Sequence, residues 1–145
     1  MRITRQEMMR KIAYVIAERS TCYRLKVGAV ISYDGRVIST GYNGSRPGHS
    51  HCTPETCNPG HRCTRTIHAE KNAINFARLQ GVEDFSKMEL HITDSPCMDC
   101  AKYIVSSGIK TVYYDREYRL MESIEWLRSQ GVMIVSYAKI HLPQE

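Results

Sequence analysis

The sequence predicts an α/β sandwich built on a mixed sheet. Helical and short apolar segments alternate along the chain, which is the order that packs helices against a sheet. Asp34-Gly35 separates the apolar segments 27–33 and 36–40, and this dipeptide is a strong signal for an antiparallel hairpin. Helices separate the later strands, so those strands are expected to pair in parallel.

The first part of the chain gives one helix before the hairpin. Thr4 is the expected N-cap of a helix over 4–20. Gly28, in the first strand, is small enough to let a ligand approach the backbone. After the hairpin, Asn43 suits a turn in the left-handed conformation. Four apolar side chains of the helix recur at helical spacing and are expected in the core: Met8, Ile12, Val15 and Ile16.

The second part of the chain repeats a strand–helix pattern. A helix-prone amphipathic segment follows His68. Beyond it, strands are expected over 88–93, 110–114 and 131–136, and helices over 96–107 and 118–130, the latter with Leu120, Ile124 and Leu127 facing inward.

Length and composition fit a single domain over 1–145. A chain of 145 residues with 42% hydrophobic and 24% charged residues can bury a core without disulfides. Its apolar run at 12–17 is too short to cross a membrane and has no signal-peptide pattern around it, so we expect a cytoplasmic protein. The net charge of +5 suits a phosphate-bearing substrate. The sequence has no obvious run of basic residues of the kind that would indicate a nucleic-acid-binding surface.

Three residues have the chemistry of zinc ligands. His68, Cys97 and Cys100 offer one nitrogen and two thiolates, and three protein ligands leave a fourth position open for water, as in catalytic zinc sites. Both cysteines fall in one helical turn that Pro96 would begin. Glu70, two residues after the histidine, is placed to exchange protons with that water. The alternatives are a zinc finger that lacks a ligand and a redox Cys-x-x-Cys pair.

The segment 45–66 is rich in cysteine and histidine and has little apolar periodicity. A long irregular segment inside a domain needs a tether or a function. Cys52, Cys57 and Cys63, together with Cys22, could hold a second, structural zinc, in which His49, His51 or His61 replaces one cysteine. The alternative is free buried thiols and exposed histidines.

Five motifs together resemble the deoxycytidylate (dCMP) deaminase family, and its phage and bacterial members in particular. They are G-Y-N-G at 41–44, H-C at 51–52, R-T-I-H-A-E at 65–70, P-C-M-D-C-A-K at 96–102 and S-G-I-K-T-V-Y-Y at 107–114. His-x-Glu with Pro-Cys-x-x-Cys is the signature of zinc deaminases. The resemblance implies a three-layer α/β/α sandwich of the cytidine deaminase type, with a mixed five-stranded sheet and helices on both faces.

The same resemblance implies an activity and roles for matching residues. The activity is zinc-dependent hydrolysis of dCMP to dUMP and ammonia, which supplies dUMP for thymidylate synthesis. His68, Cys97 and Cys100 would hold the zinc, and Glu70 would move protons. In the substrate, Asn43 would contact the sugar hydroxyl, the Ala69 amide the base carbonyl, and the Ser95 carbonyl the departing amino group.

Family likeness also implies an assembly and its control. Members are homohexamers, and many are activated by dCTP with magnesium and inhibited by dTTP. The candidate effector contacts are Gly44, Ser45 and Arg46. A phage-encoded member would act in the host cytoplasm.

The substrate phosphate needs a cationic contact. Arg116 and Arg119 follow the strand 110–114 at its carboxyl end, with Tyr118 between them to pack on the sugar. Arg46 could serve the substrate or an effector instead. Two other functions remain open, a tRNA adenosine or polynucleotide cytosine deaminase and a zinc-dependent nucleic-acid-binding module without catalysis.

Overall fold

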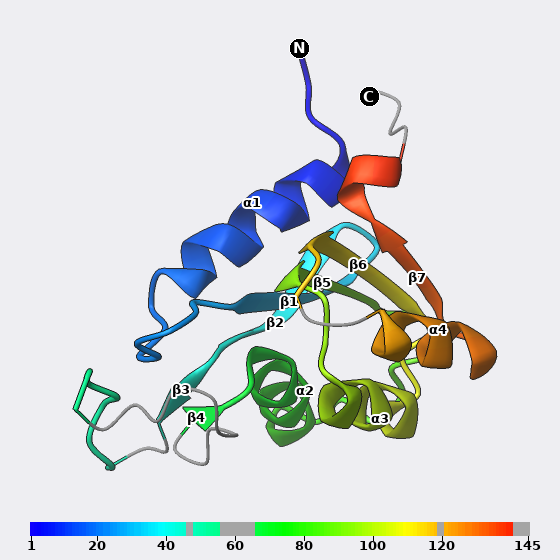
Figure 1. The fold of residues 1–145 in the computed structure, drawn as a ribbon. Coiled ribbons are helices and arrows are strands. Elements are labelled where there is room, and N and C mark those ends of the chain that lie inside the picture. Colours follow the sequence, from blue (N-terminus) through cyan, green and yellow to red (C-terminus); the bar gives the residue numbers. More distant parts are fainter. Residues whose placement is uncertain (46–47, 56–65, 119–120, 141–145) are drawn as a thin grey trace.

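A mixed five-stranded sheet forms the centre of the molecule (Figure 1). The computed structural model describes residues 1–45, 48–55, 66–118 and 121–140. The strand order is β2-β1-β5-β6-β7. β1 pairs antiparallel with β2 and β5, whereas β5, β6 and β7 run parallel, which confirms the predicted hairpin followed by parallel pairing. The strands are β1 (Gly28–Tyr33), β2 (Arg36–Tyr42), β5 (Glu89–Asp94), β6 (Thr111–Arg116) and β7 (Met133–Ser136).

Helices cover both faces of this sheet. α1 (Arg5–Ala17) lies on one face, and α2 (Ala69–Leu79), α3 (Met98–Ser107) and α4 (Glu122–Ser129) lie on the other (Figure 1). Buried side chains of these three helices form one core with the sheet, while α1 makes a smaller core with Val30. The predicted three-layer sandwich is therefore confirmed.

Smaller elements complete the described parts of the chain. β3 (Gly44–Ser45) and β4 (Thr66–Ile67) pair as a separate two-stranded ribbon, and a 3₁₀ helix, η1 (Tyr137–Lys139), follows β7. Within the described ranges, none of the helices combines the length and the apolar character that a membrane span requires.

Most predicted element ends are right to within two residues, and one helix start is wrong. Thr4 caps α1 as expected, since its side chain accepts a hydrogen bond from the Glu7 amide at 3.1 Å. The helix predicted to begin at Tyr118 begins at Glu122 instead. Ser95 Oγ fixes the backbone of Tyr118 outside the helix, because it accepts a hydrogen bond from the Tyr118 N–H at 2.8 Å and donates to the Tyr118 carbonyl oxygen at 3.0 Å, the atom that a helix would use as an acceptor. Leu120 lies outside the described residues, and the other two predicted core positions of this helix are buried, Ile124 and Leu127.

The face that α1 turns to the sheet differs from the prediction. Met9, Ala13 and Ala17 are buried, whereas Val15, which we expected in the core, is 63% exposed. The reason is close packing on β1: a Cβ at Gly28 would lie 1.9 Å from the Ala13 carbonyl oxygen. Gly28 thus admits the backbone of a helix rather than a ligand.

A second glycine sets the position of α2 on the opposite face. A Cβ at Gly41 would lie 2.4 Å from the Ala69 carbonyl oxygen and 2.5 Å from the Ala73 nitrogen. Ser39, two residues before Gly41 on β2, donates a hydrogen bond from its Oγ atom to the Ala73 carbonyl oxygen at 2.7 Å. The beginning of α2 therefore rests directly on β2.

Candidate active site and metal centre

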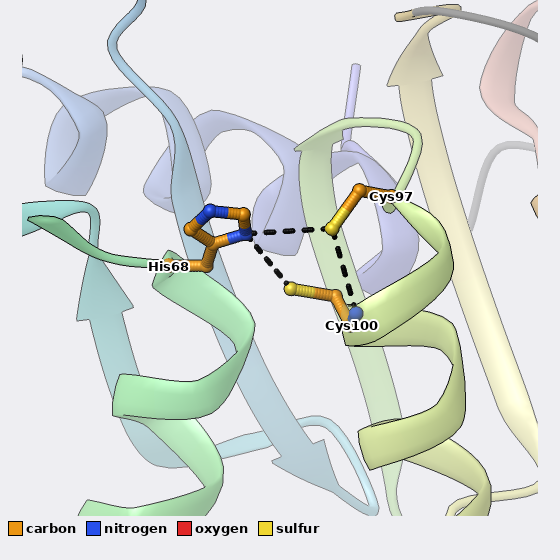
Figure 2. Close-up of side chains that lie close together, drawn as sticks. All are labelled: His68, Cys97 and Cys100. Carbon is orange, nitrogen blue, oxygen red and sulfur yellow. Dashed lines mark hydrogen bonds between the residues drawn. The ribbon is translucent and has the colours of Figure 1, made fainter. Parts of the chain in front are cut away.

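The three predicted zinc ligands meet at the N-terminal ends of two helices. His68 is the N-cap of α2, Cys97 is the N-cap of α3, and Cys100 lies in the first turn of α3. His68 Nδ1 lies 3.0 Å from Cys100 Sγ and 3.5 Å from Cys97 Sγ (Figure 2). The positive ends of both helix dipoles point to this group, which favours thiolates there.

The donor set fits a zinc ion. One nitrogen and two sulfurs are a common zinc set, and all three ligand atoms lie within 4.8 Å of one another. Zinc bonds of about 2.0–2.3 Å in a tetrahedron place such atoms roughly 3.5–3.8 Å apart. The side chains are thus already near the positions that a shared ion requires, and a fourth position is left for a small ligand.

Contacts among these three side chains shift their pKa values in different directions. The hydrogen bond from the Cys100 thiol and the nearby His68 lower the pKa of Cys97 to about 3. The same bond, together with burial, raises the pKa of Cys100. The Cys97 contact raises the pKa of His68. The low pKa of Cys97 favours a thiolate there, and zinc would be held by both cysteines as thiolates.

Glu70 lies in the first turn of α2 and is only 4% exposed. Burial is the main cause that raises its pKa above the ordinary value of 4.5. A carboxyl group with a raised pKa can both accept and return a proton near neutral pH. The side chain lines the same pocket as His68 and Cys97, as a proton shuttle would have to.

A pocket opens beside these residues and brings together most of the predicted substrate contacts. Seven of the predicted site residues line it: Asn43, His68, Ala69, Glu70, Ser95, Cys97 and Tyr118. Five further residues complete its lining, namely Cys22, Arg24, Leu25, Val27 and Asp94. Of these five, only Cys22 was singled out from the sequence, and it was assigned to a different metal.

Asn43 is only 8% exposed, and its amide group bonds mainly within the protein. The amide oxygen accepts hydrogen bonds from Ser20 Oγ at 2.6 Å and from the Val27 N–H at 2.8 Å. The amide nitrogen donates to the Leu25 carbonyl oxygen at 2.7 Å. The alternative of a left-handed turn is wrong, because the only described non-glycine residue with positive φ is Asp34. Asn43 thus shapes the pocket wall and has one amide hydrogen left for a ligand.

Of the three arginines predicted to contact the phosphate, only Arg116 lies among the described residues. Arg116 pairs with Asp94 at 2.8 Å and covers the Tyr14 ring, and it does not line the pocket. Arg119 and Arg46 lie outside the described residues. Arg24, which no sequence pattern marked, is exposed and lines the pocket, so it is the described cation best placed for a phosphate.

The second metal site lies largely outside the described residues. Cys57, His61 and Cys63 fall there, while Cys22 and Cys52 are half-buried, and His49 and His51 are exposed. Within the described ranges, His68, Cys97 and Cys100 form the one group that could hold a metal. The second zinc remains a prediction.

Two of the three predicted effector contacts lie in the β3–β4 ribbon. Gly44 and Ser45 form β3, and the Ser45 N–H donates to Thr21 Oγ1 at 2.9 Å. Ser45 Oγ is sealed from solvent without a hydrogen-bond partner in the described part of the chain. Arg46 is not among the described residues.

Fold and site together define a zinc-dependent hydrolase of the deaminase class. Residues 3–116 match the family model for the cytidine and deoxycytidylate deaminase zinc-binding region. The chain therefore belongs to the cytidine and deoxycytidylate deaminase family.

Several relatives place the chain within this family. It is 42% identical over 129 residues to ComE operon protein 2 of Bacillus subtilis, covering 88% of this chain and 68% of that protein. It is 34% identical over 173 residues to the deoxycytidylate deaminase of Enterobacteria phage T2, and the match covers 90% of this chain and 91% of the phage protein. The crystal structure of dCMP deaminase from cyanophage S-TIM5, in complex with dCMP and dUMP, matches with a TM-score of 0.79 and 35% identity, covering 90% and 95%.

Proposed function

We propose that this protein deaminates dCMP to dUMP and releases ammonia. The observation that carries the proposal is the buried Glu70 beside the His68, Cys97 and Cys100 group, in a pocket open to a small ligand. Two observations support dCMP as the substrate. The phage T2 and T4 relatives, which align along 91% and 89% of their own length, are deoxycytidylate deaminases, and the cyanophage enzyme was solved in complex with dCMP and dUMP.

The pocket residues divide the chemistry between them. Zinc, when bound, lowers the pKa of a coordinated water to about 7 and so supplies the nucleophile at neutral pH. Glu70 takes the proton of the attacking water and delivers it to the ring nitrogen beside carbon four of the cytosine. Glu70 next takes the remaining proton from the hydroxyl group now on carbon four and gives it to the amine. The bond from carbon four to the amine breaks, ammonia departs, and the carbonyl of the product forms. The Ala69 N–H would hold the base carbonyl, and the Ser95 carbonyl would accept a hydrogen bond from the amine.

Arg24 is our candidate for the contact to the 5′-phosphate. It lines the pocket, whereas the guanidinium of Arg116 is paired with Asp94. A hydrogen bond to a charged group contributes about 1.5–3 kcal/mol, so Arg24→Ala should lower kcat/KM for dCMP at least tenfold. The loss should be far smaller with deoxycytidine, which lacks the phosphate.

The test of the activity is ammonia release from dCMP, deoxycytidine, cytidine, dCTP and a short RNA. We expect dCMP to be preferred, and Glu70→Gln to abolish most of the turnover. Arg19→Ala is the matched control for Arg24→Ala, since Arg19 is an exposed arginine of the same region that does not line the pocket. Ammonia release from RNA but not from dCMP would contradict the proposal.

Three finer proposals follow from family likeness. The first is a second, structural zinc on Cys22, Cys52, Cys57 and Cys63 or a nearby histidine, which elemental analysis would show as two zinc ions per chain. The second is a homohexamer, which light scattering would measure. The third is activation by dCTP with magnesium and inhibition by dTTP, for which titration of the ammonia assay with each nucleotide is the test. The product would serve thymidylate synthesis.

A further inference from the structure

Asp94 is a buried carboxylate in the pocket wall that the reaction leaves without a role. It ends β5, and its side chain is only 5% exposed. Its Oδ1 atom accepts hydrogen bonds from Arg116 at 2.8 Å and from the Thr93 hydroxyl at 2.6 Å. The Thr93 hydroxyl in turn accepts a hydrogen bond from the Gly28 N–H at 3.2 Å. The carboxylate is therefore held in one orientation before any ligand binds.

The second oxygen, Oδ2, has no donor within the described parts of the chain. A buried carboxylate oxygen without a partner carries a large desolvation cost unless a ligand or water satisfies it. The only described side-chain oxygen that is both sealed from solvent and unpartnered is Ser45 Oγ. Oδ2 of Asp94 is not among the sealed, unpartnered atoms of the described residues, and Asp94 lines the pocket, so Oδ2 is a candidate acceptor for a ligand there.

A nucleotide in this pocket offers two kinds of donor to that oxygen, its exocyclic amine and its sugar hydroxyl. The amine must lie at Glu70 and the zinc ligands. Asp94 instead lies where β5 and β6 end, paired with Arg116, whose guanidinium reaches the Lys26 carbonyl and the Tyr14 ring on the surface. A phosphate would be repelled by the carboxylate and attracted by Arg24. The sugar hydroxyl remains as the partner.

We propose that Asp94 Oδ2 accepts a hydrogen bond from the 3′-hydroxyl of a 2′-deoxyribonucleotide and so selects nucleotides that carry this hydroxyl. This inference rests on the proposed function. It also explains how the pocket can hold the hydroxyl although the amide oxygen of Asn43 already accepts two hydrogen bonds from the protein. Arg116 acts as a positioning residue that holds the carboxylate in place.

The test compares dCMP with 2′,3′-dideoxycytidine 5′-monophosphate, which lacks only the 3′-hydroxyl. Zinc-loaded wild-type protein, Asp94→Ala, Asp94→Asn and the control Glu89→Gln are assayed for ammonia release. Glu89 is a matched control because it is a carboxylate of the same strand that does not line this pocket. A hydrogen bond to a charged acceptor predicts that wild type and Glu89→Gln prefer dCMP by roughly 10- to 150-fold in kcat/KM.

The quantity compared is the ratio of kcat/KM for dCMP to kcat/KM for the dideoxy nucleotide. In Asp94→Ala this ratio should fall close to one, and in Asp94→Asn it should take an intermediate value. A variant that merely loosens the site lowers both rates together and leaves the ratio unchanged, and that result would overturn the inference while leaving the proposed function intact. Inactivity on both nucleotides in a folded Asp94→Asn protein would overturn it as well. Wild-type protein that releases no ammonia from dCMP would overturn both proposals.

Discussion

Replacing Gly41 by alanine tests whether β2 positions the catalytic helix. The new Cβ would lie 2.4 Å from the Ala69 carbonyl oxygen and 2.5 Å from the Ala73 nitrogen. Both are backbone atoms of the first turns of α2, so no side chain can rotate away to relieve the contact. Ordinary contact begins at 3.4 Å, and the start of α2 must therefore move by about 1 Å. His68 and Glu70 move with it.

The size of the effect follows from this displacement. Overpacking of this kind costs typically about 1–3 kcal/mol of stability. A misplacement of about 1 Å in a catalytic group can lower the rate by roughly 100-fold. We expect Gly41→Ala to be folded at 25 °C with a lower midpoint of thermal unfolding. Its kcat/KM for dCMP, per folded molecule, should fall by about two orders of magnitude.

Gly28→Ala is the control, because it creates an equally severe contact on the other face of the sheet. There the new Cβ would lie 1.9 Å from the Ala13 carbonyl oxygen, and α1 carries none of the residues proposed for the reaction. This variant should lose stability to a similar extent and keep most of its activity per folded molecule. Thermal unfolding followed by circular dichroism, with the ammonia assay, gives both quantities. Equal loss of activity in the two variants would refute the reasoning.

Four further predictions follow from the site and the core. Glu70→Gln should keep the fold and the zinc content and lower turnover by roughly 100- to 10,000-fold, and retention of a tenth of the activity would exclude the shuttle role. Burial raises the pKa of Glu70 in the folded protein above 4.5. Ionisation of this buried carboxyl group therefore lowers the free energy of unfolding as the pH rises. Metal-free Glu70→Gln should then unfold at a higher temperature than metal-free wild type at about pH 7 and at the same temperature at about pH 4. Ala13→Val should cost about 1–3 kcal/mol, whereas Val15→Ser should change the unfolding free energy by less than about 0.5 kcal/mol, both measured by urea titration. Replacing Cys52 with serine should lower the unfolding midpoint and the zinc content, with little change in kcat for dCMP, and unchanged zinc content would count against the second metal.

The sequence was most informative where local chemistry decides the structure. The Asp34-Gly35 hairpin, the Thr4 cap and the helix start at His68 depend on neighbouring residues, and all three are confirmed. The helix expected to begin at Pro96 begins two residues later, at Met98. The three predicted zinc ligands could be proposed for the same reason, because nitrogen and thiolate donors at fixed spacing have few other uses, and the structure brings these three side chains together.

Contacts between distant segments were harder to predict. The buried face of α1 was assigned to large apolar residues, and Met8 and Ile12 do pack at its edge. Opposite Gly28 the helix backbone touches the sheet, so the buried residues there are Ala13 and Ala17. Arg24 and Asp94 lie 70 residues apart, and only the antiparallel pairing of β1 with β5 brings their segments to one pocket. No spacing rule along the chain contains that information.

The metal ligands also connect two separate parts of the chain. His68 begins α2 and Cys97 begins α3, and these two residues are 29 positions apart, with the whole of α2 and β5 between them. A bound ion would close this segment into a loop, much as a disulfide does. The chain-entropy relation for a loop of that length gives about 3–4 kcal/mol of stabilisation from the unfolded state alone. Loss of the ion would lower the free energy of unfolding by about this amount, while the core that α2 and α3 share with the sheet keeps the two helices packed.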